Sequence, residues 1–282
     1  MWDILEKYTV APSVETDEQY LALDEVQFHA RFQDCICHSL AVDVYRAMQA
    51  REPVDEQKIH EAEHLCELWC RRGLSEEDDN FRYAQQILAL AKDSAAGKAI
   101  DMSAYAAPAV DEADKEIMLR VIHERRSVRA FSDREVPDEL LEKILEAGLY
   151  AAHSSNLQSI RYLVIREKNE PWLFRGSDIP PGPVHIAILQ DERCYLTNHE
   201  KALINRVMDA GAATTNILLA IHAHGLDGVW LTYIPENMER LRKRFNLPDY
   251  IRIVDFIDLG YGIQTPYPPQ RPSVEERVIV RV

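Results

Sequence analysis

Three arginines and one serine fall within five consecutive residues near the middle of the chain, in the run Arg125-Arg126-Ser127-Val128-Arg129. Each guanidinium presents a planar fork of N–H donors that fits phosphate oxygens, and the serine adds a neutral hydroxyl. The run therefore predicts a binding site for one small ligand that carries a phosphate. Taken alone, the same run is also typical of a solvated basic turn that follows a helix.

A second polar run follows along the chain, His153-Ser154-Ser155-Asn156-Leu157-Gln158. Its hydroxyls and amides can both donate and accept hydrogen bonds, as the edge of a heterocycle requires. Between the two runs, residues 137–151 carry apolar side chains at helical spacing, so a helix should hold both runs at fixed positions. These apolar residues are Leu140, Leu141, Ile144, Leu145, Ala147 and Leu149.

The order and spacing of these segments resemble the nitroreductase family of FMN-dependent oxidoreductases, over about residues 114 to 282. That family opens roughly with Arg-Arg-Ser-Val-Arg-x-Phe, continues through Val-Pro and a helix, and then reads Pro-Ser-x-x-Asn-x-Gln-Pro. This chain has Phe131 and Val136-Pro137 in the matching places. It departs from the pattern at His153, where the family often has proline, and at Ser159, where proline followed by an aromatic residue is common.

The resemblance implies an α+β fold with a mainly antiparallel sheet flanked by helices. Here the fold would carry an extra all-helical N-terminal region: residues 1–110 would form that region and its linker, and residues 111–282 the FMN-binding domain. The resemblance also implies a homodimer with shared active sites, in which FMN passes hydride from NADH or NADPH to a small electrophile such as a nitroaromatic or a quinone. The alternative is a non-enzymatic flavin-binding module whose N-terminal region serves for interactions.

The same resemblance implies which residues bind the flavin. The arginine run and Arg271 would bind the phosphate and the pyrimidine edge, although a second basic residue that often precedes the late one in the family is absent here. The turn that begins at Ser154 would contact the flavin of the partner subunit, and the backbone around Leu231-Thr232-Tyr233 would lie beside flavin N5. No catalytic side chain is expected, because flavin N5 does the chemistry, and no metal is expected. The predicted cofactor-binding residues are Arg125, Arg126, Ser127, Arg129, Ser154, Ser155, Asn156, Gln158, Leu231, Thr232 and Arg271.

The net charge of the 282-residue chain is −15, and it is unevenly distributed. Residues 1–110 carry 10 Lys and Arg against 21 Asp and Glu, a net charge of −11, whereas residues 111–282 carry 22 against 26, a net charge of −4. Because phosphate contacts need clustered Lys and Arg, this balance argues against nucleic acids and anionic membranes as partners. No apolar run approaches membrane-spanning length and no secretory signal is visible, so we expect a cytoplasmic protein. The odd number of cysteines, five, argues against a disulfide framework.

The rest of the chain reads as helices followed by alternating strands and helices. Small residues at 210–213 and Gly211 in particular indicate close approach by another backbone, because glycine weakens a helix interior. We expect helices at 17–50 (as more than one), 55–72, 75–92, 114–122, 199–224 and 235–245, a linker at 93–111, buried strands at 162–165 and 184–189, and further strands at 227–234, 251–259 and 276–282.

The N-terminal part also contains a pattern that imitates a metal site. The run His60-Glu61-Ala62-Glu63-His64 matches the zinc-protease motif, and Cys66 and Cys70 follow it. At about 100° per residue, both histidines fall on the polar face of the predicted helix, whereas the cysteines edge its apolar face. One metal ion could not easily take ligands from both faces. We interpret the histidines as solvated and the two cysteines as core residues.

Two features of the sequence indicate a dimer in addition to the family resemblance. The small residues at 210–213 allow close packing of two helices. The alternating Val278, Val280 and Val282 predict a final strand with nothing after it to cover its edge, and exposed edges are normally paired or blocked. A two-fold arrangement would make each contact twice.

Overall fold

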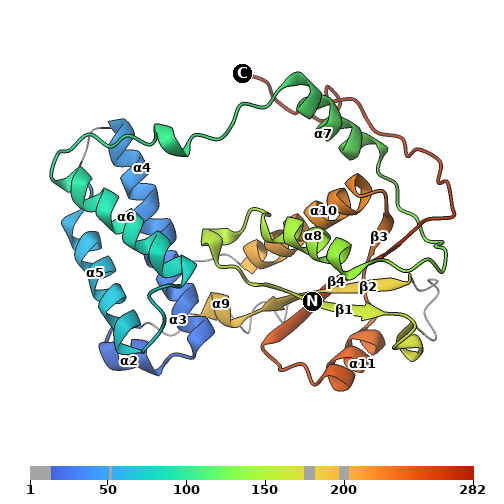
Figure 1. Cartoon of the computed structure of the whole chain (residues 1–282), viewed down its shortest axis with the longest axis horizontal. Coiled ribbons are helices and arrows are strands. Elements are labelled where there is room, and N and C mark those ends of the chain that lie inside the picture. Colours follow the sequence, from blue (N-terminus) through green and yellow to red (C-terminus); the bar gives the residue numbers. More distant parts are fainter. Residues whose placement is uncertain (1–13, 51–52, 175–181, 197–202) are drawn as a thin grey trace.

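The structure is a computed structural model that describes residues 14–50, 53–174, 182–196 and 203–282. Two parts lie side by side in Figure 1: a group of helices from the N-terminal residues, and a sheet with helices on both faces. The predicted α+β fold with an extra helical N-terminal region is therefore confirmed. The division of the chain between residues 110 and 111 stays a prediction.

Capping residues decide where the N-terminal helices begin. The side chain of Asp24 accepts a hydrogen bond from the backbone N–H of Gln27, which starts a new helix and confirms that residues 17–50 form more than one. The predicted start of a helix at Ser75 is wrong, because Asp78 caps the helix and residues 75–78 form turns before it. The elements are α2 (Asp17–Ala22), α3 (Glu25–Phe32), the π-helix η1 (Gln33–Leu40), α4 (Ala41–Ala50), α5 (Glu56–Arg71) and α6 (Asp79–Ala95).

Trp69 lies at the centre of the core of this helical part. Its ring centroid is 4.7 Å from that of Phe32, 5.4 Å from that of Phe81 and 6.1 Å from that of Phe28. The large buried residues of this core come from α2 to α6 and the segment that joins α4 to α5. The helical part thus has a hydrophobic core of its own.

The sheet has four strands in the described part of the chain, in the order β1-β2-β4-β3, and all three pairs are antiparallel. The helices α8 and α10 cover one face, and α11 and the short η4 cover the other (Figure 1). The central strand β2 is buried along its whole length. The elements are α8 (Asp138–Leu149), η3 (Ser154–Asn156), β1 (Ile160–Arg166), η4 (Pro171–Phe174), β2 (Val184–Asp191), α9 (Arg193–Leu196), α10 (Leu203–Ala223), β3 (Asp227–Leu231), α11 (Pro235–Phe245) and β4 (Ile251–Gly260).

Most predicted elements of this part are confirmed, with two corrections. The strand at 162–165 exists within β1, but the prediction that it is buried is wrong, because β1 is an edge strand and Val164 is 38% exposed. The predicted close approach at Gly211 is also wrong within the chain, since an added Cβ there would meet only one ring carbon of Trp230, at 3.8 Å. Ala210 and Ala213 are buried in the chain's own core instead. The predicted start of this helix at 199 lies outside the described residues.

Two segments have few contacts with the rest of the chain. The linker before Asp111, which contains the short helix η2 (Ser103–Tyr105), is mostly exposed, and α7 (Glu112–Glu124) buries none of its residues. The predicted final strand at 276–282 is wrong: these residues are exposed and pair with no described strand. Alternating valines are not sufficient for a strand, because a strand also needs a partner edge.

Within the described residues, no helix is both long and apolar enough to cross a bilayer. The expected cytoplasmic location stays a prediction.

Candidate functional site

The arginine run follows α7 directly and lies along the edge formed by β3 and the end of β4. The backbone N–H of Val128 donates to the carbonyl of Gly228 at 3.3 Å. Further along, Ser132 N–H donates to the Tyr261 carbonyl at 2.8 Å, and the N–H of Ile263 donates to the Ala130 carbonyl at 3.0 Å. These bonds fix the arginine run to the sheet.

Two glycines, one at the end of β4 and one just after it, make this approach possible. An added Cβ at Gly260 would lie 2.5 Å from a Pro183 carbon and 3.3 Å from Cβ of Phe131. An added Cβ at Gly262 would lie 2.4 Å from the Asp227 carboxylate and 3.0 Å from a Val128 methyl carbon. A larger residue at either position would push the arginine run away from the sheet.

Arg125 has the least satisfied side chain of the run. It is half-buried, and its Nη1 is buried without a hydrogen-bond partner among the described residues. Burial lowers the pKa of Arg125, and the nearby positive charges of Arg271 and Arg126 lower it further. Cations thus gather around a guanidinium that has an unused donor, which is the arrangement that an anion would stabilise.

The other predicted phosphate ligands lie close by. Arg126 donates to the carbonyl of His123 at 2.7 Å, so part of its guanidinium satisfies the end of α7. Ser127 is half-buried and Arg129 is exposed, with its backbone N–H bonded to Gln264 Oε1 at 3.1 Å. Arg271 is exposed. The structure therefore brings Arg125, Arg126 and Arg271 together, with Ser127 and Arg129 beside them in the chain.

The second polar run forms a tight turn with an unusual backbone. Ser155, Asn156 and Gln158 have φ angles of 47°, 52° and 52°, in the left-handed region that non-glycine residues rarely adopt. The hydroxyl of Ser155 is buried and has no partner among the described residues, whereas Asn156 and Gln158 are exposed. The turn thus presents two amide side chains outward.

The turn lies against the N-terminal helices. Its neighbours there are η1, which packs against η3, and Asn80 at the start of α6, whose Oδ1 lies 3.5 Å from Gln158 Nε2. Within the described residues, no hydrogen bond or ion pair joins the turn to the arginine run. The arginine run is bonded to β3 and the end of β4, whereas the turn packs against η1 and bonds to Asp209 of α10, so one chain holds the two predicted halves of the flavin site on different elements.

The predicted contacts with the flavin ring lie where β3 ends. Leu231 is half-buried and packs against the core on the α11 side, and Thr232 is exposed. The next residue, Tyr233, was expected to contribute only its backbone, and sequence reasoning gave its side chain no role. Its hydroxyl bonds to His185 Nε2, and His185 Nδ1 lies 2.7 Å from the Asp258 carboxylate. Burial raises the pKa of Tyr233 well above its ordinary value, so Tyr233 keeps its proton.

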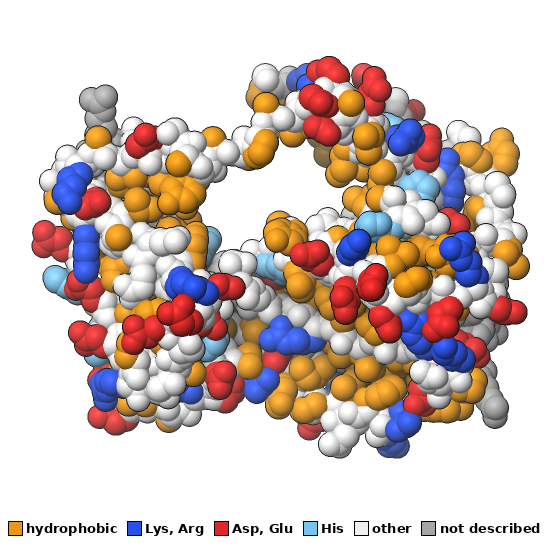
Figure 2. Space-filling view, in the orientation of Figure 1, with side chains coloured by type: hydrophobic (Ala, Val, Ile, Leu, Met, Phe, Trp, Pro, Cys, Tyr) orange, Lys and Arg blue, Asp and Glu red, His pale blue; other side chains and the backbone are white. Residues whose placement is uncertain are grey.

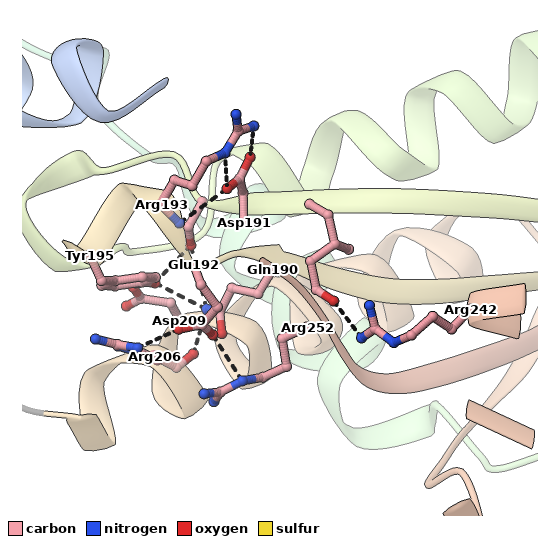
Figure 3. Close-up of polar contacts among 11 residues, drawn as sticks. Gln190, Asp191, Glu192, Arg193, Tyr195, Arg206, Asp209, Arg242 and Arg252 are labelled. Atoms are coloured by element: carbon pink, nitrogen blue, oxygen red, sulfur yellow. Dashed lines mark hydrogen bonds and ion pairs between the residues drawn. The ribbon is translucent and has the colours of Figure 1, made fainter. Parts of the chain in front are cut away.

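Sequence reasoning also missed a buried polar network at the end of β2. Glu192 bonds to Arg206, and its carboxylate lies 2.8 Å from Arg252 Nε. Tyr195 donates to Asp209 at 2.6 Å. Figure 3 shows these side chains gathered where β2 ends. The available signal was the charged run Asp191-Glu192-Arg193 directly after a buried strand.

The histidines and cysteines of the run that imitates a metal site do not come together, as the helical geometry predicts. His60 and His64 are exposed and lie 3.2 Å from Glu63 and 2.6 Å from Asp17, respectively. Cys66 is buried, and burial raises the pKa of its thiol to about 11. The placement of Cys70 in the core is wrong, because Cys70 is exposed. Among the described residues, no group of three or more His, Cys, Asp or Glu could hold a metal ion, and none of the five cysteines forms a disulfide.

Comparisons with known proteins match the part of the chain that carries the site. The model of the nitroreductase family matches residues 122–179 and 171–261. A protein of Archaeoglobus fulgidus named "Putative NADH dehydrogenase/NAD(P)H nitroreductase" is 34% identical over 52% of this chain and 86% of its own length. The NADPH-flavin oxidoreductase of Vibrio harveyi is 26% identical over 58% of this chain and 71% of its own length.

Solved structures give the same match. A protein of Desulfovibrio desulfuricans, whose crystal structure was determined in complex with FMN, superposes with a TM-score of 0.52 at 29% identity. The match covers 58% of this chain and 96% of that protein. The helical N-terminal part accounts for most of the chain that these relatives leave uncovered.

Proposed function

The chain belongs to the nitroreductase family, and from this premise we propose that it is an FMN-dependent NAD(P)H oxidoreductase that reduces a small electrophile of the nitroaromatic or quinone type. The names of the relatives support the FMN and the nicotinamide donor. The nitroaromatic or quinone substrate goes beyond what these names support and is our own proposal. When bound, FMN would supply the hydride chemistry, so the chain would need to supply only binding and orientation.

The observation that carries the proposal is the unused donor of Arg125. Its buried Nη1 has no hydrogen-bond partner among the described residues, and the neighbouring Arg271 and Arg126 are also positive. A phosphate monoester would accept these donors and remove the repulsion among the cations. The residues present therefore fit the phosphate end of FMN.

The remaining predicted residues take roles that follow from their positions. Ser127 and Arg129 would add donors beside the phosphate. Leu231 and Thr232, at the end of β3, would offer backbone groups to the flavin ring. The turn residues Asn156 and Gln158 present amides that could bond to polar ring edges. No acid–base pair is assigned.

The test of this function uses purified protein. We expect FMN to bind with a dissociation constant in the micromolar range or below, and NADH or NADPH to be oxidised when a nitroaromatic or quinone is added. No FMN binding at micromolar concentration would refute the proposal. Tight FMN binding with a flavin that stays oxidised under anaerobic NADH and NADPH would instead favour the non-enzymatic flavin-binding module.

We further propose that the functional unit is a homodimer with shared sites. The helix α7 exposes Ile117, Met118 and Leu119 by 52%, 52% and 53%. Met208 on α10 is 62% exposed and Tyr150 after α8 is 81% exposed. Figure 2 shows an open gap below α7 with hydrophobic side chains around it. Apolar surface of this extent is typical of a partner interface, and obligate dimers usually bury more than about 2,000 Å².

Separation of the arginine run from the turn supports the sharing of sites. If each flavin takes its phosphate ligands from one chain and its turn contacts from the other, both halves can stay where a single chain places them. We expect complementation between two inactive variants, Arg125→Ala with Arg129→Ala in one chain and Ser155→Ala with Asn156→Ala in the other. The mixed dimer would have one intact site and about half of the wild-type activity.

Two results would contradict this arrangement. After verified exchange of subunits, continued inactivity of the mixed dimer would show that each site is built within one chain. A monomer in sedimentation at micromolar concentration would exclude the dimer itself.

A further inference from the structure

The turn at Ser154–Gln158 has a backbone that must be held by its surroundings. Three of its residues have positive φ angles, and two of these, Ser155 and Gln158, are residue types that rarely adopt them. Such a conformation persists only where neighbouring groups over-determine it. Groups outside the turn must therefore fix its conformation.

Asp209 of α10, the helix that covers one face of the sheet, fixes the start of the turn. Its Oδ1 accepts hydrogen bonds from the backbone N–H of Ser154 at 2.9 Å and from the Ser154 hydroxyl at 3.0 Å. Asp209 is 4% exposed. A buried carboxylate with two bonds to one residue holds that residue in a single position.

Tyr195 of α9 fixes the position of Asp209. Its hydroxyl donates to Asp209 Oδ2 at 2.6 Å and lies 2.7 Å from the Ser159 hydroxyl and 3.0 Å from Gln190 Nε2. Burial and the neighbouring Asp209 raise the pKa of Tyr195, so it stays a proton donor at all ordinary pH values. Figure 3 shows Tyr195 and Asp209 pointing toward each other from α9 and α10.

The ring of Tyr195 faces a different part of the chain. It forms a small buried cluster with Ala30 of α3, Leu157 of the turn and Cys194, and Val26 packs against the same cluster. The helices α3 and α9 are in contact, and Arg193 lies 3.5 Å from Asp24 at the start of α3. Tyr195 therefore touches both the N-terminal helices and the network that holds the turn.

We propose that Tyr195 and Asp209 are positioning residues for the flavin: they hold the Ser154–Gln158 turn in the conformation that contacts FMN, and Tyr195 couples this turn to the docked N-terminal helices. The inference rests on the proposed function and assigns a role to the N-terminal helical part, which completes the support of the turn. Neither residue is expected to touch substrate.

The test compares two tyrosine hydroxyls. Tyr195→Phe removes the donor to Asp209 and leaves a buried carboxylate oxygen without it. Tyr162→Phe is the matched control, because the Tyr162 hydroxyl is buried without a hydrogen-bond partner among the described residues. We expect Tyr195→Phe to raise the FMN dissociation constant about tenfold, as loss of a buried charge-assisted bond does, and Tyr162→Phe to change it less than about twofold.

A second measurement does not depend on the cofactor. Hydrogen exchange at the amide of Ser154, in the protein without FMN, should become about tenfold faster in Tyr195→Phe and stay unchanged in Tyr162→Phe. Asp209→Asn should shift both readouts in the same direction, because it removes the charge of the acceptor that Ser154 and Tyr195 share, and its combination with Tyr195→Phe should add little. If Tyr195→Phe folds poorly, Asp209→Asn with the same control decides.

The outcomes separate the two proposals. If the wild type binds FMN, but Tyr195→Phe and Asp209→Asn match Tyr162→Phe in FMN affinity and Ser154 exchange, the positioning role is refuted and the proposed function stands. If thermal stability falls while both readouts stay unchanged, Tyr195 is merely structural and the inference is also wrong. A wild type that binds no FMN refutes both.

Discussion

The arginine run and the Ser154–Gln158 turn differ in how far the chain already satisfies them. Arg125 keeps an unused buried donor beside two further cations. The turn, in contrast, is bonded to Asp209 from one side and packed against Ala30 from the other. Among the described residues, one half of the proposed site therefore has no partner of opposite charge, whereas the other half is held by its own chain.

This difference assigns different contributions to the two halves. The arginine run can gain free energy from an anion directly, because Arg125 Nη1 has no acceptor among the described residues and its neighbours Arg126 and Arg271 are also positive. The turn has been ordered before any ligand arrives, so it can contribute orientation at little further entropic cost. Charge at the arginine run and preorganisation at the turn would together explain binding of a ligand with a phosphate at one end and a ring at the other.

The largest expected effect concerns the N-terminal helices, which the turn and α9 contact. Trp69→Ala removes the central ring of the N-terminal core, and Trp69 is 1% exposed. We expect a loss of about 3–5 kcal/mol in the free energy of unfolding of that part, measured by chemical denaturation. Hydrogen exchange at the turn should accelerate, whereas exchange at Val128, whose N–H bonds to Gly228, should not.

The control for this change is Tyr105→Ala, because Tyr105 is 73% exposed. It should alter the free energy of unfolding by less than about 0.5 kcal/mol. Equal acceleration of exchange at the turn and at Val128 after Trp69→Ala would show that the two halves do not differ in their dependence on the N-terminal helices.

The second prediction addresses the arginine run. Arg125→Ala combined with Arg271→Ala should weaken FMN binding by about 100-fold, because two charge-assisted contacts to phosphate are lost. The free energy of unfolding should stay constant or rise, since two cations that repel each other are removed. Fluorescence titration with FMN and chemical denaturation measure the two effects.

A matched control removes the same amount of positive charge at a different place on the protein. Arg46→Ala with Arg82→Ala removes two exposed arginines of the N-terminal part. It should leave FMN affinity within about twofold, because exposed charges more than a Debye length away are screened. If both double variants weakened binding equally, the effect would be one of net charge and not of a phosphate site.

The third prediction is a pH dependence at the entry to the turn. Burial lowers the pKa of His153 below its ordinary 6.5, and Asp209 opposes this shift in part. The unfolded chain therefore takes up a proton more readily than the folded chain as the pH falls below about 6.5. The contribution of neutral His153 to the free energy of unfolding should be fully present above that pH, and it should be lost as the pH falls below it.

His153→Gln tests this sign, because it removes the titrating group and keeps polar atoms. Chemical denaturation at about pH 7.5 and about pH 5.5 should show a larger loss of stability on acidification for the wild type than for the variant. An equal loss in both proteins would place the pH dependence elsewhere.

The smallest expected effect is that of Asn80→Ala. Asn80 Oδ1 also accepts a hydrogen bond from Gln33 within the helical part, but its contact with Gln158 is 3.5 Å long and exposed, so its loss should change FMN affinity by less than about threefold. An effect as large as that of Tyr195→Phe would mean that the helical part holds the turn chiefly through this contact and not through the buried cluster at Tyr195.

Local sequence determined most of the secondary structure. Helical spacing of apolar residues predicted α5, α7, α8 and α11, and uninterrupted apolar runs predicted β2 and β4. The arginine run was also visible, because its chemistry lies in five adjacent residues. The family pattern then gave the fold, since the order of its motifs is a property of the sequence alone.

Tertiary structure decided what depends on residues far apart in the chain. The pattern of β1 does not reveal that the strand lies at an edge, and alternation at 276–282 does not supply the partner that a strand needs. The bond between Tyr195 and Asp209, and the cluster that joins Ala30 to Leu157, unite elements that only folding brings into contact. Periodicity reports which face of an element is buried, but not against what, because the partner is chosen by packing across the whole chain.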